Sequence, residues 1–500
     1  MSPNEARLVR NTSLTVVALV VLRLVGAAWT PLTFDEAYYW MWSKHLAFGY
    51  YDHPPGVAVL IRLGTMIAGD SELGVRLVSI LLALPMSYAV YRTASILFGG
   101  QRLAASATIL LNITLMAAVG TLIVTPDSLL LAASSFVLFF LAKVLESGRG
   151  AWWLAVGAAV GVALLSKYTA LFFGPAILIW LASVPRLRRW LVSPWPYLGA
   201  IVALAVFAPV ILWNADHDWV SFIKQIGRSR IGQFKPSFIG ELIPTQIAFA
   251  TPLVFILGAM GLSTLLRRDG GAMAARMLIN AVFWTIALYF IWHSLHARVE
   301  ANWFAPVYPA FAIAAAVAAH STRWERRAQR IVDFCLRWAS PVGILMFALL
   351  IVQANTGALT GFRRDATVRS VGVGWPELAA AIDAVRLRTG ATCVLAPDYG
   401  TTSWLAFYLP RGSCVVQPTQ RFRWVNTPEP DPALLSGKLL YVDEVRPLAQ
   451  LYVKETFARV LRVAELKRMR GPLTIETYGL DLLEDAKGAV LDDSPPPELE

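Results

Sequence analysis

The segment from Leu32 to Gly56, LTFDEAYYWMWSKHLAFGYYDHPPG, concentrates side chains that can do chemistry. It holds three carboxylates, Asp35, Glu36 and Asp52, and two histidines among eight aromatic rings. Carboxylates accept protons or hold cations, and an imidazole gains or loses a proton near neutral pH. The segment directly follows an apolar run at residues 14–30 that is suited to enter a membrane, so this chemistry stands where the chain leaves a bilayer.

The first half of the segment has both a structural and a catalytic interpretation. Thr33 and Glu36 have the spacing of a capping box, and an acidic first turn suits the helix dipole. Capping explains Glu36 well but Asp35 only in part, because Thr33 already supplies the cap. We take Asp35 and Glu36 as candidate catalytic residues, with capping as the alternative role, above all for Glu36. The rings at residues 38–42 are typical of a helix in the membrane interface.

The second half of the segment, YYDHPPG, predicts a rigid binding loop. Asp52 has an ordinary alternative as a turn residue, and Pro54 and Pro55 would stiffen any loop. A carboxylate and an imidazole beside two prolines and aromatic rings are nevertheless held in fixed positions, which a binding site requires and a surface turn does not. Asp52 and His53 are therefore predicted to bind substrate.

Two further ionisable residues have structural alternatives of their own. Asp127, in TPDS, fits an ordinary helix start with Thr125 as the cap and Pro126 in the first turn. Lys167 has two interpretations: a lysine that snorkels to the membrane surface, or an ammonium group that binds an anion. Ionisable residues near membrane depth usually face a cavity and mark function, so both are predicted to bind substrate.

The polar loop at residues 214–244 adds further cations. Arg228 and Arg230 of this loop are predicted to contact a substrate anion. Arg23 interrupts the first apolar run, and the sequence does not indicate its partner or a functional role for it.

The composition is that of an integral membrane protein. Of 500 residues, 56% are hydrophobic and only 15% are charged, and the mean hydropathy is +0.55. A soluble domain is about 45–50% apolar and about 25% charged. The net charge of +11 does not indicate nucleic-acid binding, because the basic residues stand in short clusters between apolar runs, as in cytoplasmic loops.

The apolar runs predict about eleven membrane-spanning helices, each needing roughly 20 apolar residues. The expected spans are residues 12–31, 73–98, 103–121, 128–145, 152–166, 168–184, 196–213, 245–266, 277–293, 304–320 and 339–355. The break at Lys167 is the weakest feature of this pattern, because it rests on a single short polar interruption.

The loop charges predict the orientation of these spans. Arginine clusters fall on one side of the pattern, at residues 186–189, 267–276 and 323–337. The positive-inside rule then puts the N-terminus in the cytoplasm, and residues 32–72 and 356–500 outside it. A cleaved signal peptide at residues 1–28 is an alternative, but Arg23 interrupts its apolar stretch and favours an uncleaved first helix.

The residues after the last span predict a small α/β domain. The stretch WPELAAAIDAVRLRTG has a helical pattern, and the strand-like runs TCVLAPD, SCVVQ, KLLYVDEV and PLTIETYGL follow it. The expected fold is thus a mainly α, polytopic transmembrane domain at residues 1–355, a periplasmic α/β domain at 356–488 and a disordered tail at 489–500. Cys393 and Cys414 can form a disulfide only if this domain lies outside the cytoplasm.

Common motifs of soluble enzymes are absent from the sequence, which has no Walker loop, G-x-G-x-x-G, H-E-x-x-H or G-x-S-x-G. Carboxylates and cations that collect on the outer face suit a different substrate, a lipid-linked phosphate. The residues alone therefore favour a site at the membrane surface over soluble nucleotide chemistry.

Taken together, the motifs resemble bacterial glycosyltransferases of the GT-C superfamily that use polyprenyl-phosphate sugars, of the protein O-mannosyltransferase and aminoarabinose transferase type. The resemblance rests on the Asp-Glu pair after the first span, YYDHPP, TPD, LLSKYTA, LWNADHDWVSF and RVEANWFAPVYP, within residues 10–320. The most similar pattern is that of the group with rhizobial lipid A and core galacturonosyltransferases. The resemblance implies a multi-span bacterial inner-membrane protein with interfacial helices in a first periplasmic loop at residues 32–72 and a periplasmic α/β tail.

The resemblance also implies roles for individual residues. The first-loop aspartate of the superfamily, a catalytic base, falls on Asp35. The Glu-Lys-Pro-Pro motif of aminoarabinose transferases matches Asp52-His53-Pro-Pro here; its acidic residue helps to hold a divalent metal ion, and its lysine faces the donor phosphate. The histidine that completes the metal site has no match, since His217 is offset, so a metal cofactor with Asp52 as ligand is left open.

The expected reaction transfers a sugar from a polyprenyl phosphate to an acceptor hydroxyl, with inversion at the anomeric carbon. Asp35 accepts the hydroxyl proton. Lys167, which like Asp127 matches a polar position of the family's cavity, stabilises the leaving phosphate together with His53 and the loop arginines.

The expected acceptor is lipid A or the lipopolysaccharide core, with a protein acceptor as the alternative within the superfamily. A flippase for lipid-linked sugars and a non-catalytic assembly protein are alternatives from other classes. The paired inverted repeats that are typical of a transporter are not found in the sequence.

Overall fold

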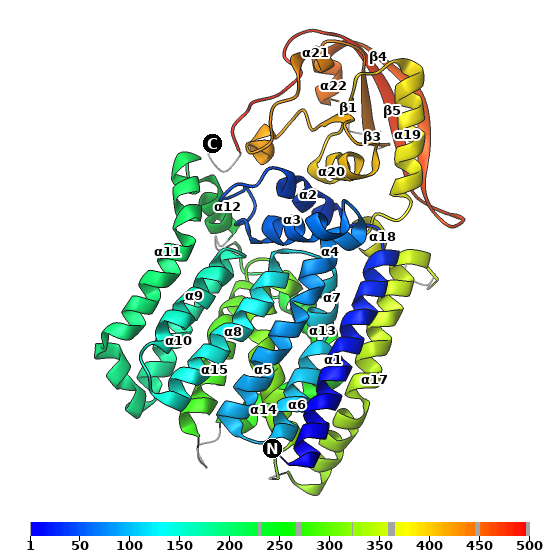
Figure 1. Ribbon diagram of the computed structural model, residues 1–500. Coiled ribbons are helices and arrows are strands. Elements are labelled where there is room, and N and C mark those ends of the chain that lie inside the picture. The colour runs from blue at the N-terminus through cyan, green and yellow to red at the C-terminus, as the bar shows by residue number, and fades with distance from the viewer. Residues whose placement is uncertain are drawn as a thin grey trace.

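The computed structural model describes residues 2–228, 232–266, 272–322, 324–358, 366–445 and 451–496. A bundle of helices carries a smaller α/β domain on one end (Figure 1). We call the end of the bundle beneath this C-terminal domain the upper face, as it is drawn in Figure 1; the N-terminus lies at the opposite end.

The bundle is built from helices that match the expected apolar runs. Its helices are α1 (Pro3–Trp29), α4 (Glu72–Leu81), α5 (Ala83–Phe98), α6 (Gln101–Asn112), α7 (Leu115–Leu122), α8 (Pro126–Ser147), α9 (Trp152–Leu164), α10 (Phe173–Ser183), α11 (Pro194–Asp216), α12 (Val220–Arg228), α13 (Ser237–Ala250), α14 (Pro252–Leu266), α15 (Met273–His293), α16 (Tyr308–Ala319) and α17 (Arg326–Thr356), with the 3-10 turns η1 (Tyr168–Phe172), η2 (Pro185–Val192) and η3 (Ala301–Val307) between them. Each expected span overlaps one or two of these elements.

The expected count of eleven spans is not confirmed. By length and composition, seven helices within the described residues can cross a membrane, or nine if each of two bent pairs is one span. The pair α6 and α7 bends by 56°, and the pair α13 and α14 by 102°. The segments read as the fifth and sixth spans, α9 and η1–α10, are shorter apolar helices on either side of the break at Ser166-Lys167.

The bend between α6 and α7 explains the arginine inside the first apolar run. Arg23 is buried and donates to the main-chain oxygen of Asn112, the last residue of α6, at 2.7 Å. The side chain of Asn112 in turn donates to Ser87 at 2.7 Å. The carbonyl that the helix end leaves without an intrahelical donor is thus satisfied by a neighbouring helix.

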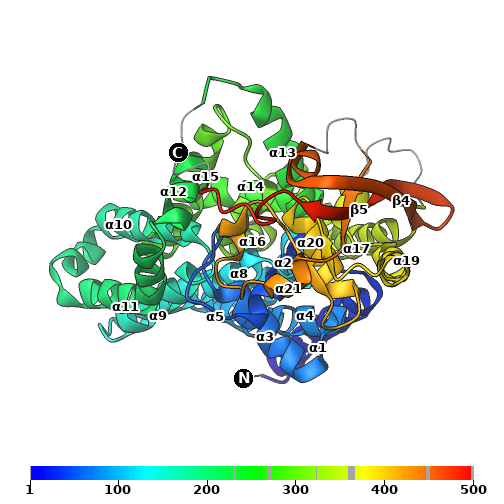
Figure 2. The same ribbon diagram turned by 90° about the horizontal axis from the view of Figure 1, so that it is seen from above.

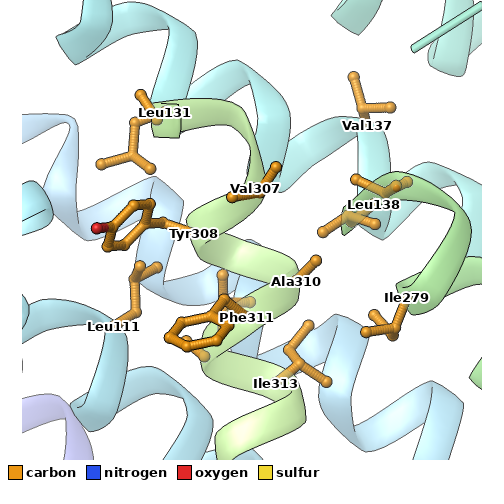
Figure 3. Close-up of a cluster of buried hydrophobic side chains, with 14 of the residues drawn as sticks. Leu111, Leu131, Val137, Leu138, Ile279, Val307, Tyr308, Ala310, Phe311 and Ile313 are labelled. Carbon is orange, nitrogen blue, oxygen red and sulfur yellow. The ribbon is translucent and has the colours of Figure 1, made fainter. Parts of the chain in front are cut away.

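The interior of the bundle is closely packed. Figure 3 shows α16, preceded by Val307, lying among side chains of the neighbouring helices. Every residue of α16 from Tyr308 to Ala316 is buried, as expected for a central helix that is apolar all round. Helices α9 and α11 approach so closely at Gly157 that a Cβ atom there would lie 1.9 Å from the carbonyl oxygen of Gly199, an approach that only glycine permits.

Two helices of the first loop lie across the upper face, α2 (Phe34–Lys44) and α3 (Gly56–Ala68) (Figure 1). In α2 the capping box expected from the sequence is present, because Thr33 accepts from the Glu36 main-chain N–H and Glu36 accepts from the Thr33 N–H. The loop between the two helices holds YYDHPP and folds back on itself, with Tyr50 N–H donating to the His53 carbonyl oxygen.

The C-terminal domain is a five-stranded mixed sheet with helices packed on it. Its elements are α18 (Ala366–Ser370), α19 (Trp375–Thr389), β1 (Cys393–Leu395), α20 (Tyr399–Tyr408), β2 (Cys414–Val416), η4 (Arg421–Trp424), α21 (Pro432–Leu435), β3 (Leu439–Glu444), α22 (Leu451–Thr456), β4 (Phe457–Arg470) and β5 (Leu473–Ala486). The strand order is β2-β1-β3-β5-β4, with β1 parallel to β2 and β3 and the other pairs antiparallel.

The four strand-like runs of the sequence correspond to β1, β2, β3 and β5. The edge strand β4 is missing from the expectation, because its sequence FARVLRVAELKRMR is rich in charge and mostly exposed. After β5 the chain continues without regular secondary structure, and Val490 is buried against the sheet. The expectation of a disordered tail stays a prediction for residues 497–500, which lie outside the described residues.

The C-terminal domain docks directly on the first loop. The Leu32 main chain donates to the Tyr408 hydroxyl at 2.9 Å and accepts from the Trp404 indole at 3.0 Å. Helix α20 is therefore hydrogen-bonded to the segment that precedes α2. Figure 2, which looks down on the upper face, shows the sheet to one side of α9, α10 and α11. Side chains of α2, α19 and α20 share one hydrophobic cluster, so the domain is continuous with the upper face.

A disulfide joins Cys393 of β1 to Cys414 of β2 and closes the loop that contains α20. We expect the double substitution Cys393→Ser and Cys414→Ser to lower the free energy of unfolding of the C-terminal domain by about 2–4 kcal/mol, because a loop of this size is more costly to order once the crosslink is gone. Thermal unfolding of the purified protein with and without a reducing agent measures this. The buried free thiol at Cys335 provides the control, since Cys335→Ser leaves the disulfide intact and the response to reducing agent unchanged.

Candidate active site

The two adjacent carboxylates at the start of α2 have different surroundings. Glu36 is fully buried, and its two oxygens accept from Arg76 at 2.7 and 2.6 Å and from the Val124 N–H at 3.0 Å. Together with the capping bond, these contacts engage both carboxylate oxygens. The geometry therefore gives Glu36 the structural role that the capping alternative described, rather than contact with a substrate.

Asp35 is half-buried at the first turn of α2. The hydroxyl of Tyr399, which begins α20, donates to Asp35 Oδ1 at 3.2 Å. The Tyr399 ring lies edge-on to Phe34 and tilted against Tyr38, so the hydroxyl is held by the rings around it. The candidate base thus has a partner in the C-terminal domain that no local sequence signal identifies.

Asp52 is the centre of a second cluster. Its carboxylate pairs with Lys224 of α12 and with Arg423 of η4, at 3.0 Å for Arg423, and accepts from the Tyr38 hydroxyl at 3.1 Å. Burial by itself raises the pKa of Asp52, but the charges of Lys224 and Arg423 outweigh burial, so the pKa lies below its usual value. Asp52 is therefore a stable anion in this cluster.

The cations of this cluster lie on aromatic rings. The Lys224 ammonium is 3.7 Å from the centre of the Tyr51 ring, and the Arg423 guanidinium lies 4.9 Å from the same ring. Such contacts stabilise a partly desolvated cation. Two cations therefore face the Asp52 carboxylate.

Asp127 and Lys167 form a third cluster, deeper in the bundle. The Lys167 ammonium lies 2.8 and 2.9 Å from the two Asp127 oxygens, and Asn302 of η3 donates to Asp127 at 2.6 Å. Both charged residues are buried. The expected helix start is also present, because Thr125 and Ser128 form a capping box. The anion that Lys167 meets in this structure is therefore Asp127.

The remaining predicted residues are His53, Arg228 and Arg230. His53 lies in the same loop as Asp52, with its ring centre 6.3 Å from that of Tyr39. Arg228 is described as the last residue of α12, and Arg230 lies outside the described residues. His217, the offset histidine, stacks on Trp213 at 4.1 Å.

The arrangement does not fit Asp52 as a metal ligand. A lysine, an arginine and a tyrosine hydroxyl already occupy the Asp52 carboxylate, and cations repel a metal ion from it. Within the described part of the chain, no three His, Cys, Asp or Glu side chains group closely enough to hold a metal ion. We therefore derive no chemical step through a metal.

Sequence reasoning missed four residues of these clusters. Lys224 stood in a loop already noted for its charge, so charge was the available signal. Asn302 lies in RVEANW, one of the motifs that carry the family resemblance. Tyr399 and Arg423 had no local signal, because each lies more than 360 positions from its carboxylate and only the tertiary fold brings them together.

The chain matches part of a known family and of two curated proteins. Residues 52–213 match the family described as dolichyl-phosphate-mannose-protein mannosyltransferase. The chain is 30% identical over 220 residues to the lipid A galacturonosyltransferase RgtD of Rhizobium johnstonii, and 28% identical over 218 residues to the lipopolysaccharide core galacturonosyltransferase RgtA of the same organism. These matches cover 42% and 43% of this chain, and 44% and 43% of the two relatives.

Solved structures agree with the whole fold. ArnT from Cupriavidus metallidurans, bound to undecaprenyl phosphate, superposes with a TM-score of 0.62 and 18% identity over 94% of this chain and 97% of ArnT. The oligosaccharyltransferase AglB from Archaeoglobus fulgidus superposes with a TM-score of 0.51 and 13% identity over 91% of this chain and 70% of AglB. The resemblance to the GT-C superfamily drawn from the sequence is confirmed, and so is the mainly α fold with a small C-terminal sheet.

The buried position of Glu36 leads to a first prediction for this site. Glu36→Gln leaves the Arg76 guanidinium buried without its counter-charge, and we expect it to cost about 3–5 kcal/mol of stability. The measurement is the thermal midpoint of the purified protein in detergent. Glu72→Gln is the matched control, because Glu72 accepts from Tyr408 near the same junction but is only partly buried. A Glu36→Gln protein that is as stable as wild type but inactive would instead give Glu36 a direct catalytic role.

Proposed function

We propose that this GT-C-type protein is a membrane glycosyltransferase that moves a sugar from a polyprenyl-phosphate donor to lipid A or the lipopolysaccharide core. One observation carries the proposal: Asp35 stands on an interfacial helix and accepts from the Tyr399 hydroxyl, beside a second carboxylate, Asp52, that pairs with two cations. A base next to cations is what transfer from a phosphate donor requires.

The comparisons support the donor and acceptor classes without fixing them. RgtD and RgtA are named for lipid A and the lipopolysaccharide core, and the ArnT structure contains undecaprenyl phosphate. The chain spans less than half the length of the two curated relatives, so their whole activity is transferred here only as a proposal. A protein acceptor is the second candidate, because the matched family is named for protein mannosylation.

The proposed reaction is a single displacement. Asp35 takes the proton of the acceptor hydroxyl while the hydroxyl oxygen forms its bond to the anomeric carbon. The bond from that carbon to the phosphate oxygen breaks, and its electron pair leaves with the polyprenyl phosphate. This leaving group departs as an anion and needs no proton donor. Attack from the side opposite the leaving group inverts the anomeric centre.

The cations of the site are assigned to the departing phosphate. Lys224 stands at the edge of the Asp52 cluster, and Lys167 stands deeper, next to Asp127. Fixed cations aimed at developing negative charge stabilise a transition state without having to reorganise during the reaction. Both lysines now face carboxylates, so the donor phosphate has to compete with Asp52 or Asp127 for their ammonium groups.

We base the proposed location of the protein in the cell on its helices and loop charges. A multi-pass bundle of this kind fits the bacterial inner membrane. We assign the upper face and the C-terminal domain to the periplasm and the N-terminus to the cytoplasm, on the strength of the arginine clusters in the loops of the opposite side.

The main test is the base assignment. We expect Asp35→Asn to lower transfer by about 10²- to 10⁴-fold, because an amide cannot accept the hydroxyl proton. The assay detects polyprenyl phosphate released from donors that carry galacturonic acid, aminoarabinose or mannose, with lipid A or core oligosaccharide as the acceptor. Asp70→Asn is the matched control, since Asp70 is a carboxylate of the same first loop that pairs with Lys44 and Trp40 instead.

Two results would contradict the proposal. Transfer by Asp35→Asn at the wild-type rate would remove Asp35 as the base. Movement of the lipid-linked sugar across vesicles without release of polyprenyl phosphate would identify a flippase instead of a transferase.

A further inference from the structure

The C-terminal domain contacts both carboxylates of the first loop. Tyr399 donates to Asp35 at 3.2 Å, and Arg423 donates to the two oxygens of Asp52 at 3.0 and 3.3 Å. The two carboxylates come from separate halves of the first loop, one on α2 and one before α3. A domain that only rested on the bundle would have no reason to meet both of them with polar side chains.

The position of Tyr399 is fixed from both of its sides. Asp398 caps α20 by accepting from the Thr401 N–H at 2.9 Å, so the helix begins at a defined residue. At the other end of α20, Trp404 and Tyr408 bond to the main chain of Leu32, just ahead of α2. The same helix is therefore attached to the start of α2 and delivers a hydroxyl to the first acidic residue of α2.

The position of Arg423 is fixed in the same manner. Its Nε donates to Gln420, a residue in the left-handed region with φ of 55°, at 2.8 Å. The Asn426 amide donates to the Gly49 carbonyl at 2.9 Å and its oxygen accepts from Trp213 at 3.2 Å, which anchors the segment to the bundle. The Arg423 side chain is only 16% exposed, so it lies within the junction between the two domains.

The two contacts are also joined to each other. The Arg423 guanidinium lies 5.0 Å from the centre of the Tyr399 ring and 4.9 Å from that of Tyr51, the neighbour of Asp52. A continuous series of contacts thus runs from Asp52 through Arg423 and Tyr399 to Asp35. Displacement of the C-terminal domain would remove one contact from each carboxylate at once.

We propose that the active site is shared between the bundle and the C-terminal domain, with Tyr399 and Arg423 as positioning residues for Asp35 and Asp52. Tyr399 donates to Asp35 Oδ1 and thereby fixes the orientation of the carboxylate relative to the acceptor hydroxyl. Arg423 holds Asp52 in place, which leaves Lys224 able to turn to the donor phosphate without leaving Asp52 unpaired. The inference rests on the proposed transfer reaction.

The alternative is that these contacts only attach the domain. The Tyr408 hydroxyl, at the same junction, provides the test. It bonds to Leu32 and Glu72 and contacts neither Asp35 nor Asp52. Tyr408→Phe therefore weakens docking alone. It is matched to Tyr399→Phe in chemistry, in helix and in domain, since both substitutions remove one hydroxyl from α20.

The experiment measures steady-state kinetics of the full chain in detergent or nanodiscs. For Tyr399→Phe and Arg423→Gln we expect kcat to fall about 10- to 100-fold with KM for the donor within about twofold, because a misplaced base loses alignment rather than binding. Arg423→Lys keeps the charge, and its kcat should be at least about tenfold higher than that of Arg423→Gln. Tyr408→Phe should lower the thermal midpoint and leave kcat unchanged. If all of these variants lose stability but keep the wild-type kcat, the proposal is overturned.

A second measurement does not depend on turnover. Carbodiimide labelling of Asp35, followed by mass spectrometry of the peptide that contains residues 34–44, reports how firmly the carboxylate is held. We expect faster labelling of Asp35 in Tyr399→Phe than in Tyr408→Phe or wild type. If the wild type transfers no sugar from any donor but this difference appears, the positioning stands and the proposed function fails. Equal labelling in the three proteins overturns the positioning.

Discussion

The upper face of this protein depends on one buried ion pair. Arg76 of α4 uses all five of its N–H groups: two reach Glu36, and three reach the carbonyls of Ala27, Thr30 and Pro31 at the end of α1. Glu36 extends the network by accepting from Val124, which precedes α8. A buried charge is costly unless its hydrogen bonds are satisfied, and here both partners are satisfied only when the ends of α1, α2, α4 and α7 meet.

That constraint determines where the chemistry stands. Asp35 is the neighbour of Glu36, so its main chain is fixed by the ion pair while its side chain points into a different environment. Asp127 follows Val124 by three residues and begins α8 from the same junction. The third carboxylate, Asp52, is not tied to the junction in sequence, and it is held instead by Lys224 and Arg423. One polar network thus fixes the positions of Asp35 and Asp127. Lys224 and Arg423, the latter from the C-terminal domain, hold Asp52.

Local sequence signals identified the parts of the site but not their pairings. Thr33-x-x-Glu36 predicted the cap because capping is a matter of four consecutive residues. The pairing of Glu36 with Arg76 spans 40 positions and forms only in the tertiary fold. Lys167 and Asp127 are likewise 40 residues apart. The span count is not confirmed for a different reason: the fifth and sixth expected spans are α9 and η1–α10, which are apolar but short, and hydropathy by itself does not show whether such short helices cross a membrane.

The three carboxylates of the site are equivalent in composition but not in chemistry. Protonation of Asp52 would leave two cations without their anion, so Asp52 is not suited to take up and release a proton in each cycle. Asp127 pairs with the buried Lys167. Asp35 lies next to Glu36 on α2 and accepts from the Tyr399 hydroxyl, which orients its carboxylate. This hydrogen bond from the C-terminal domain, rather than position in a motif, is the physical reason to assign the base to Asp35.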